Sequence, residues 1–157
     1  MFANTYAAYD DLFETDQRLI ENLKVVHTVE SSFREVFPDP TEDQLATWRS
    51  HDDKIQPLVW HHSSGRKSLI TSTSGCRVIG MDEDEGEALL ERLLHWAGQS
   101  QYVYRHKWQP GDVVMWDNTG VMHKVMPFDH ECGRLLHRTT VAGSEPFDPR
   151  RDASMAA

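Results

Sequence analysis

Short apolar runs separated by turn residues fill the second half of the sequence, and this pattern restricts the fold more than any other feature. Turn signals such as 63–65 (SSG) and 109–112 (QPGD) lie between the runs, and the Pro-Gly pair is typical of a type II turn. Several short strands at such spacing are typical of a β-sandwich, a barrel or a jelly roll. We therefore predict strands at residues 57–60, 67–71, 77–79, 102–108, 113–116, 121–125 and 134–141.

The first half of the sequence and one later segment predict helices that pack outside these strands. Residues 6–12 and 19–25 carry apolar side chains at three- and four-residue spacing, which is the period of an amphipathic helix. The segment 41–44 (TEDQ) is a capping-box pattern, which predicts the start of a short helix. Residues 82–97 begin with four acidic residues, continue with a leucine stripe and end before Gly98, as expected of a longer helix. The predicted class is α+β, mostly β.

The charge balance limits the possible partners. The 157 residues include 16 Lys and Arg against 25 Asp and Glu, which gives a net charge of −9. Nucleic acid and anionic membranes both require a basic surface, so we expect neither as the main partner. The two cysteines do not form a disulfide framework, so we expect a cytoplasmic protein whose thiols are packing residues. We expect one domain over residues 1–147 and a flexible tail over residues 148–157.

Two arginines share one face of the last predicted strand. Because side chains alternate along a strand, residues 134–141 place Arg134, Leu136, Arg138 and Thr140 on the same side. The two arginine Cα atoms would lie roughly 13 Å apart, at a rise of about 3.3 Å per residue. Arginine binds carboxylates with two parallel hydrogen bonds and keeps its charge. The face is thus either a pair of anion sites or a solvated surface with salt bridges at its rim.

Among nine histidines, His123 is the best placed to do chemistry. It follows the predicted buried strand 113–116 and a turn at 119–120, so we expect it near the core, either as a metal ligand or as a packed histidine. A non-haem iron centre uses two histidines and one carboxylate. The His-x-Asp string of the chain, at residues 51–53 (HDD), lies in a polar stretch. We interpret that string as a solvated loop and not as a ligand pair.

Taken together, these motifs resemble the TauD/TfdA family of Fe(II)- and 2-oxoglutarate-dependent dioxygenases, of which taurine dioxygenase is a member. The resemblance rests on residues 109–118 (QPGDVVMWDN), on His123 and on residues 133–140 (GRLLHRTT). Three further segments match in family order, so the resemblance covers nearly the whole chain: 2–9, 57–59 and 65–69. The family fold is the double-stranded β-helix, or jelly roll, and the resemblance implies that fold here.

The resemblance also implies roles for particular residues. His123 matches the distal histidine ligand of Fe(II). Arg134 matches the arginine that pairs with the far carboxylate of 2-oxoglutarate, and Arg138 matches a second arginine that faces the anionic substrate or assists the cosubstrate site. Trp116 and Asn118 match residues that frame the site. The implied enzyme uses O2 to hydroxylate a small anionic organic substrate, such as a sulfonate, sulfate ester or carboxylate, and releases succinate and CO2.

One departure from the family pattern sets a further expectation. In the family, the His-x-Asp pair that supplies the other two iron ligands lies upstream of the segment matched by residues 2–9. We therefore expect the chain to be the C-terminal portion of such a dioxygenase, with a jelly roll that is incomplete at its N-terminus. The alternative is a catalytically inactive fragment or accessory chain that retains only anion binding. Exposed strand edges would favour a homo-oligomer or pairing with the missing N-terminal half.

Overall fold

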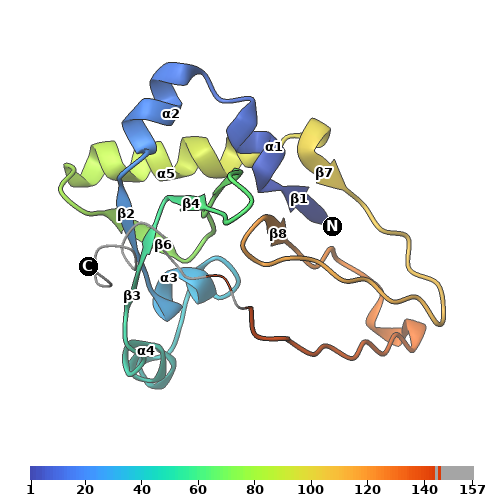
Figure 1. Ribbon diagram of the computed structural model, residues 1–157. Helices are drawn as coiled ribbons and strands as arrows, with labels where there is room; N and C mark the ends of the chain where they lie inside the picture. Colours follow the sequence, from blue (N-terminus) through green and yellow to red (C-terminus); the bar gives the residue numbers. More distant parts are fainter. Residues whose placement is uncertain (144, 146–157) are drawn as a thin grey trace.

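The computed structural model describes residues 1–143 and 145 of the protein. The predicted tail at 148–157 and the predicted domain end at 147 lie outside these residues. The described part contains helices flanking short antiparallel strands (Figure 1), as the predicted α+β class requires. The helices are α1 (Thr5–Asp10), α2 (Glu14–Ile20), α3 (Val29–Arg34), α4 (Glu42–Arg49) and α5 (Glu83–Ala97), with 3₁₀ turns η1 (Ser100–Tyr102) and η2 (His130–Cys132).

The strands of the described residues form three small antiparallel sheets. One has the order β7-β1-β8 and a second has the order β3-β2-β6, while β4 and β5 form a hairpin. The strands are β1 (Phe2–Asn4), β2 (Lys24–His27), β3 (Lys54–Pro57), β4 (Val59–His61), β5 (Lys67–Leu69), β6 (Gly75–Val78), β7 (Val103–Tyr104) and β8 (Val121–His123). The first and last thirds of the chain therefore meet in one sheet, because β1 pairs with both β7 and β8.

Local capping explains where two predicted helices begin. Thr41 and Gln44 form the complete capping box at the start of α4, so that prediction is confirmed. Asp82 accepts hydrogen bonds from two backbone amides at the start of α5, and Gly98 follows the last helical residue. No helix of the described residues is long and apolar enough to cross a membrane.

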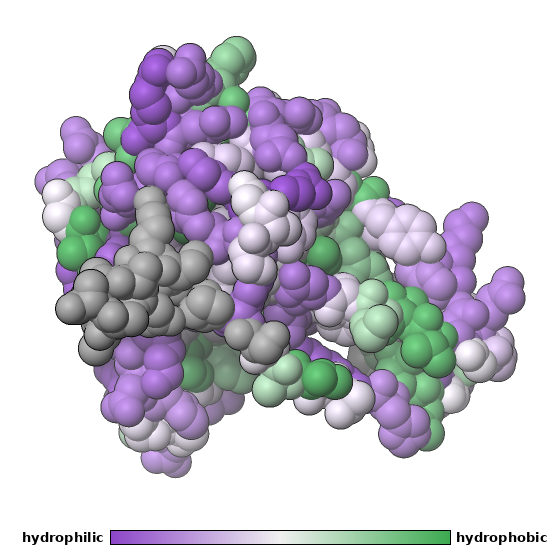
Figure 2. Space-filling view, viewed as in Figure 1, coloured by the Kyte–Doolittle hydropathy of each residue, from purple (hydrophilic) through white to green (hydrophobic). Residues whose placement is uncertain are grey.

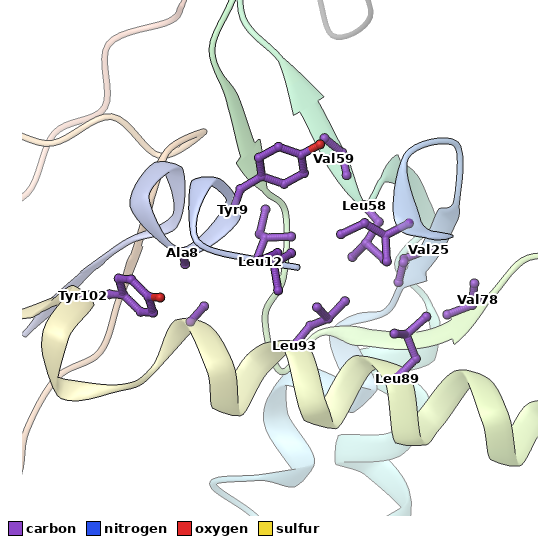
Figure 3. Packing of buried hydrophobic residues seen from close by; sticks show 13 residues of the cluster. Ala8, Tyr9, Leu12, Val25, Leu58, Val59, Val78, Leu89, Leu93 and Tyr102 are labelled. Carbon is purple, nitrogen blue, oxygen red and sulfur yellow. The ribbon is translucent and has the colours of Figure 1, made fainter. Parts of the chain in front are cut away.

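The core lies between α5, α1 and the strands beside them (Figure 3). Leu89 and Leu93 of α5 pack in one cluster with Val78 of β6, and Tyr9 of α1 reaches the same cluster. Leu93 is fully buried. The leucine stripe predicted for residues 82–97 thus faces the core, as an amphipathic helix requires.

Three local predictions are wrong, and one of them is the strand over 102–108, of which only Val103–Tyr104 forms a strand, β7. The predicted helix over 19–25 is not formed, because α2 ends at Ile20 and residues 24–27 become the central strand β2. Val25 and Val26 are buried there by pairing with β3 and β6, and β-branched residues favour such a position. Cys76 and Cys132 are both exposed, so the thiols are not the packing residues that we expected.

The largest difference from the prediction concerns the segments 113–116 and 134–141. Neither forms a strand, because no other segment of residues 1–143 pairs with it. Val113 and Met115, predicted to be buried, are 92% and 93% exposed, and Leu135 is 76% exposed. Figure 1 shows this C-terminal third as an extended arm beside the body, and Figure 2 shows apolar surface on that arm. The described residues therefore contain small sheets and not a closed jelly roll.

Candidate functional site

Strand β8 holds His123 beside the start of the chain, where its side chain is exposed and not near the core as we expected. His123 lies opposite Phe2 in the antiparallel pairing of β8 with β1. The next residue, Lys124, exchanges two 3.0 Å backbone hydrogen bonds with Met1. Just before the strand begins, the amide of Thr5 donates to the carbonyl of Gly120. The backbone that carries His123 is thus fixed on both sides of the histidine.

One indole ring joins His123 to Arg138. The Trp116 ring lies 5.1 Å from the His123 ring and 5.0 Å from the Phe2 ring, measured between centroids. The guanidinium carbon of Arg138 lies 5.9 Å from the centre of the same indole. Trp116 Nε1 in turn donates to Asn118 Oδ1 at 2.8 Å. The structure therefore brings His123, Arg138, Trp116 and Asn118 together, although they are up to 22 residues apart in sequence.

The surroundings of His123 favour its neutral form. Partial desolvation of the ring lowers its pKa from the usual 6.5, and the positive charges of Arg138 and the N-terminus lower it further. Each of these effects raises the free energy of the positively charged imidazolium form. A neutral imidazole has a free lone pair, which is the form that binds metal ions.

Arg134 lies apart from this group. Its guanidinium carbon is 4.5 Å from the centre of the Phe128 ring, and it is not among the residues that line the cavity beside His123. Its Nε is buried, with no hydrogen-bond partner among the described residues. A buried donor without a partner is costly. The shared strand face predicted for Arg134 and Arg138 is not formed, because residues 134–141 have no strand partner among residues 1–143.

A cavity of about 1230 Å³ lies next to His123, Asn118 and Arg138. It is also lined by residues of α3 and by the loop residues His51 and Asp52. Those two residues are exposed, as we predicted for the 51–53 loop. The volume exceeds the range of about 300–1,000 Å³ that is usual for small-molecule sites, so the cavity is larger than a small substrate needs.

The metal-binding capacity of the described residues is limited. Within residues 1–143 and residue 145, no group of three or more His, Cys, Asp or Glu side chains could hold a metal ion. His123 would therefore supply one ligand, whereas the iron centre implied by the sequence requires three protein ligands. The described residues alone do not fit an iron centre.

A polar cluster next to the site was missed by our sequence analysis. The Tyr6 hydroxyl donates to Asp117 Oδ2 at 3.1 Å and lies 3.2 Å from His62 Nδ1. Our sequence analysis selected His123 among the histidines and gave no role to His62. The one available signal was Asp117, because aspartate is a typical residue at the start of a turn. No sequence pattern pairs Asp117 with Tyr6.

The phenol of Tyr6 should titrate far above its usual range. Burial, followed by the hydrogen bond and negative charge of Asp117, raises the pKa of Tyr6 from 10.0 to about 12. Because the folded-state pKa is raised, the stabilising contribution is complete below pH 10.0 and is lost as the pH rises towards 12. The stability difference between the wild type and Tyr6→Phe, measured by denaturant unfolding, should shrink over this window. A difference that stays constant would contradict the assignment.

Comparison with known proteins identifies the family. The family model "Taurine catabolism dioxygenase TauD, TfdA family" matches residues 1–140. The chain therefore belongs to the TauD/TfdA dioxygenase family, as the resemblance of its motifs predicted.

Individual relatives agree with this placement. The chain is 31% identical over 160 residues to the (S)-phenoxypropionate/alpha-ketoglutarate-dioxygenase of Sphingobium herbicidovorans, covering 99% of this chain and 54% of that protein. It is 35% identical over 147 residues to the alpha-ketoglutarate-dependent 2,4-dichlorophenoxyacetate dioxygenase of a Burkholderia species, covering 90% and 48%. The crystal structure of AAD-2 in complex with Mn(II) and N-oxalylglycine superposes with a TM-score of 0.82 at 36% identity, covering 93% and 57%.

The extent of these matches is uneven. Nearly all of this chain is matched, but the chain spans about half the length of the curated relatives. The solved structure is likewise covered over 57% of its length. The activities of these whole relatives are therefore only proposals for this chain.

Proposed function

We propose that the chain supplies the C-terminal part of the active site of an Fe(II)- and 2-oxoglutarate-dependent dioxygenase with a jelly-roll fold. The observation that carries the proposal is that His123 and Arg138 both lie next to the Trp116 ring, beside a large cavity. The family match over residues 1–140 supports the same reading. The complete enzyme would use O2 to hydroxylate its substrate and would convert 2-oxoglutarate to succinate and CO2.

Each residue has a distinct role in this proposal. His123 would offer its neutral imidazole to iron, and Arg134 would pair with the far carboxylate of 2-oxoglutarate. The unpartnered buried Nε of Arg134 supports that role, because a carboxylate would satisfy it. The other two iron ligands would come from outside the described residues, where the family places its His-x-Asp pair.

We further propose that the substrate is a small anionic organic molecule. Arg138 lines the cavity and is exposed there, so its charge is available to a carboxylate, sulfonate or sulfate ester. The names of two relatives, which act on phenoxypropionate and on 2,4-dichlorophenoxyacetate, support a carboxylate. Lys54 and Lys124 also line this cavity, so positive charge is present there although the net charge of the chain is −9.

A second candidate is an accessory chain or inactive fragment that binds an anion without performing the oxidation. The observation in its favour is that the described residues contain no group of three metal-binding side chains. This candidate keeps the anion-binding roles of Arg134 and Arg138 and removes only the metal chemistry.

The proposed role of Arg134 can be tested on the chain itself. We expect Arg134→Leu to weaken 2-oxoglutarate binding about ten- to a hundredfold, because hydrogen bonds to charged groups contribute about 1.5–3 kcal/mol. Binding would be followed by nuclear magnetic resonance (NMR) titration of the metal-free chain. Arg92→Leu is the control, because Arg92 pairs with Asp16 on the surface. An affinity that is unchanged in Arg134→Leu would refute the assignment.

A further inference from the structure

Tyr6 is enclosed by side chains and backbone from three parts of the chain. The Arg66 guanidinium carbon lies 4.7 Å from the centre of the Tyr6 ring, and the His62 ring lies 4.5 Å from it. Both residues flank the loop of the β4–β5 hairpin. The backbone of Gly120, just before β8, also contacts the Tyr6 ring. Tyr6 thus touches the hairpin and the turn that leads to His123 at the same time.

Gly120 allows this close contact because it has no side chain. A Cβ atom added there would lie 1.8 Å from Cε2 of Tyr6 and 2.5 Å from Cζ. These separations are far below any van der Waals contact between carbon atoms, which is about 3.5–4.0 Å. The ring of Tyr6 and the backbone of Gly120 therefore fix each other's positions, and any side chain at 120 must displace one of them.

Asp117 binds both the Tyr6 hydroxyl and its own turn. One carboxylate oxygen accepts from Tyr6, and the other accepts from the amide and the hydroxyl of Thr119 at 2.9 and 2.8 Å. Burial alone would raise the pKa of Asp117, but these hydrogen bonds and the charge of His62 lower it overall. The carboxylate therefore remains ionised and holds the turn 117–120 to Tyr6.

The hairpin holds the same turn through a second route. His62 Nε2 lies 2.8 Å from Ser68 Oγ, and Ser68 donates to the carbonyl of Thr119 at 2.6 Å. Since the serine hydrogen goes to that carbonyl, Nε2 must donate to the serine. The other ring nitrogen lies 3.0 Å from Glu145 Oε2.

The contacts among Ser68, His62 and Glu145 have the order of a nucleophilic triad, but they cannot act as one. Ser68 is completely buried, and its hydroxyl hydrogen is already donated to the carbonyl of Thr119. A nucleophilic serine must instead meet its substrate and pass its proton to the histidine. The arrangement is therefore structural.

We propose that Tyr6 is a positioning residue, which with His62 and Asp117 fixes the turn 117–120 and thereby the places of Asn118 and His123 at the cavity. Asn118 lies within this turn, and His123 follows three residues after it. The role of His123 as a metal ligand rests on the proposed function. The positioning of the turn 117–120 by Tyr6 does not. Tyr6 and Asp117, which make the central contact, are 111 positions apart in the sequence.

The test compares Tyr6→Phe with a matched control on the same helix. Tyr9 also belongs to α1 and also donates its hydroxyl to a carboxylate, that of Glu21 at 3.2 Å. Two readouts apply to the metal-free chain: amide hydrogen exchange across residues 119–123, and the NMR shifts of the His123 ring at fixed pH. The ring shifts report position, because the Trp116 ring lies 5.1 Å away.

Tyr6→Phe should speed exchange at 119–123 about tenfold, the effect of losing one hydrogen bond of about 1.4 kcal/mol. It should also shift the His123 ring signals, while the amides of β2 stay as they are. Tyr9→Phe should leave residues 119–123 and the His123 ring unchanged. Equal acceleration along the whole chain, or unchanged His123 signals, would overturn the proposal and leave Tyr6 with a role in overall stability.

A second pair of variants tests the contact between the ring and the glycine. Gly120→Ala should displace the turn and shift the His123 signals further, or prevent folding. Adding Tyr6→Leu to Gly120→Ala removes most of the obstructing ring and should restore part of the exchange protection, as coupled neighbours do. If the double variant is as impaired as Gly120→Ala, the proposal is wrong. Neither readout uses iron or 2-oxoglutarate, so the result does not depend on the proposed function.

Discussion

Replacing Leu93 by alanine should lower the free energy of unfolding by about 2–5 kcal/mol, the range for leucine removed from a packed core. Leu93 lies in α5, is fully buried and belongs to the cluster that joins this helix to α1 and the strands. The loss combines the transfer free energy of the side chain with the cost of the cavity that it leaves. Because folded domains are marginally stable, such a loss is a large part of the total.

Urea unfolding of Leu93→Ala measures this directly, through a lower midpoint at an unchanged slope. Leu19→Ala is the matched control, because Leu19 is 50% exposed on α2 and its loss removes less buried area. We expect the control to change the free energy of unfolding by less than about 1 kcal/mol. A loss below about 1 kcal/mol for Leu93→Ala would contradict the packing described for α5.

The second large effect concerns the extended segment 113–116. Its Val113 and Met115 are almost fully exposed, and no strand of residues 1–143 pairs with the segment. Unpaired extended backbone with apolar side chains is a template for pairing with another chain. We therefore expect the isolated chain to self-associate as its concentration rises, and we expect Val113→Lys combined with Met115→Lys to suppress the association.

Sedimentation velocity over a range of concentrations checks this prediction. Phe13→Lys is the control, because Phe13 is 75% exposed but lies at the start of α2 and not on an unpaired extended segment. The control should self-associate like the wild type. The prediction is wrong if the double variant associates as strongly as the wild type, or if Phe13→Lys is equally effective.

The parts of the fold that depend on neighbouring residues could be predicted from the sequence. The capping box of α4, the acidic start and leucine stripe of α5, and the turn at 109–112 all depend on residues within a few positions of one another. At that turn Gly111 has a φ of 89°, which a type II turn requires at this position. These predictions agree with the structure because their physical causes are local.

Strands depend on partners that the local sequence does not specify. Residues 113–116 have the composition of a buried strand, but composition cannot supply the neighbour that makes a strand and covers its apolar face. Val25 shows the opposite case, since its spacing suggested a helix while pairing with two strands placed it in the centre of a sheet. In both cases the strand partners, and not the local hydrophobic pattern, decide the structure.

Part of the candidate site could be predicted from the sequence. The prediction was again limited by the separation of the contacting residues along the chain. The nearby residues His123 and Arg138 could be selected from motif spacing, and the structure places both at one ring. Tyr6 could not be selected, because its partner Asp117 is 111 residues away. Such a contact becomes visible only when the chain is folded.

The most direct test of whether this chain alone forms an iron site is an anaerobic titration of the purified chain with Fe(II) and 2-oxoglutarate. The titration would be followed by the visible charge-transfer absorption of the chelated complex. The (S)-phenoxypropionate dioxygenase relative serves as the positive control. Because the described residues offer His123 without two further ligands, we predict no saturable band from the folded chain under conditions in which the relative gives one. A saturable band that is lost in His123→Ala would contradict this, since it would require a complete iron site within the chain or between its copies.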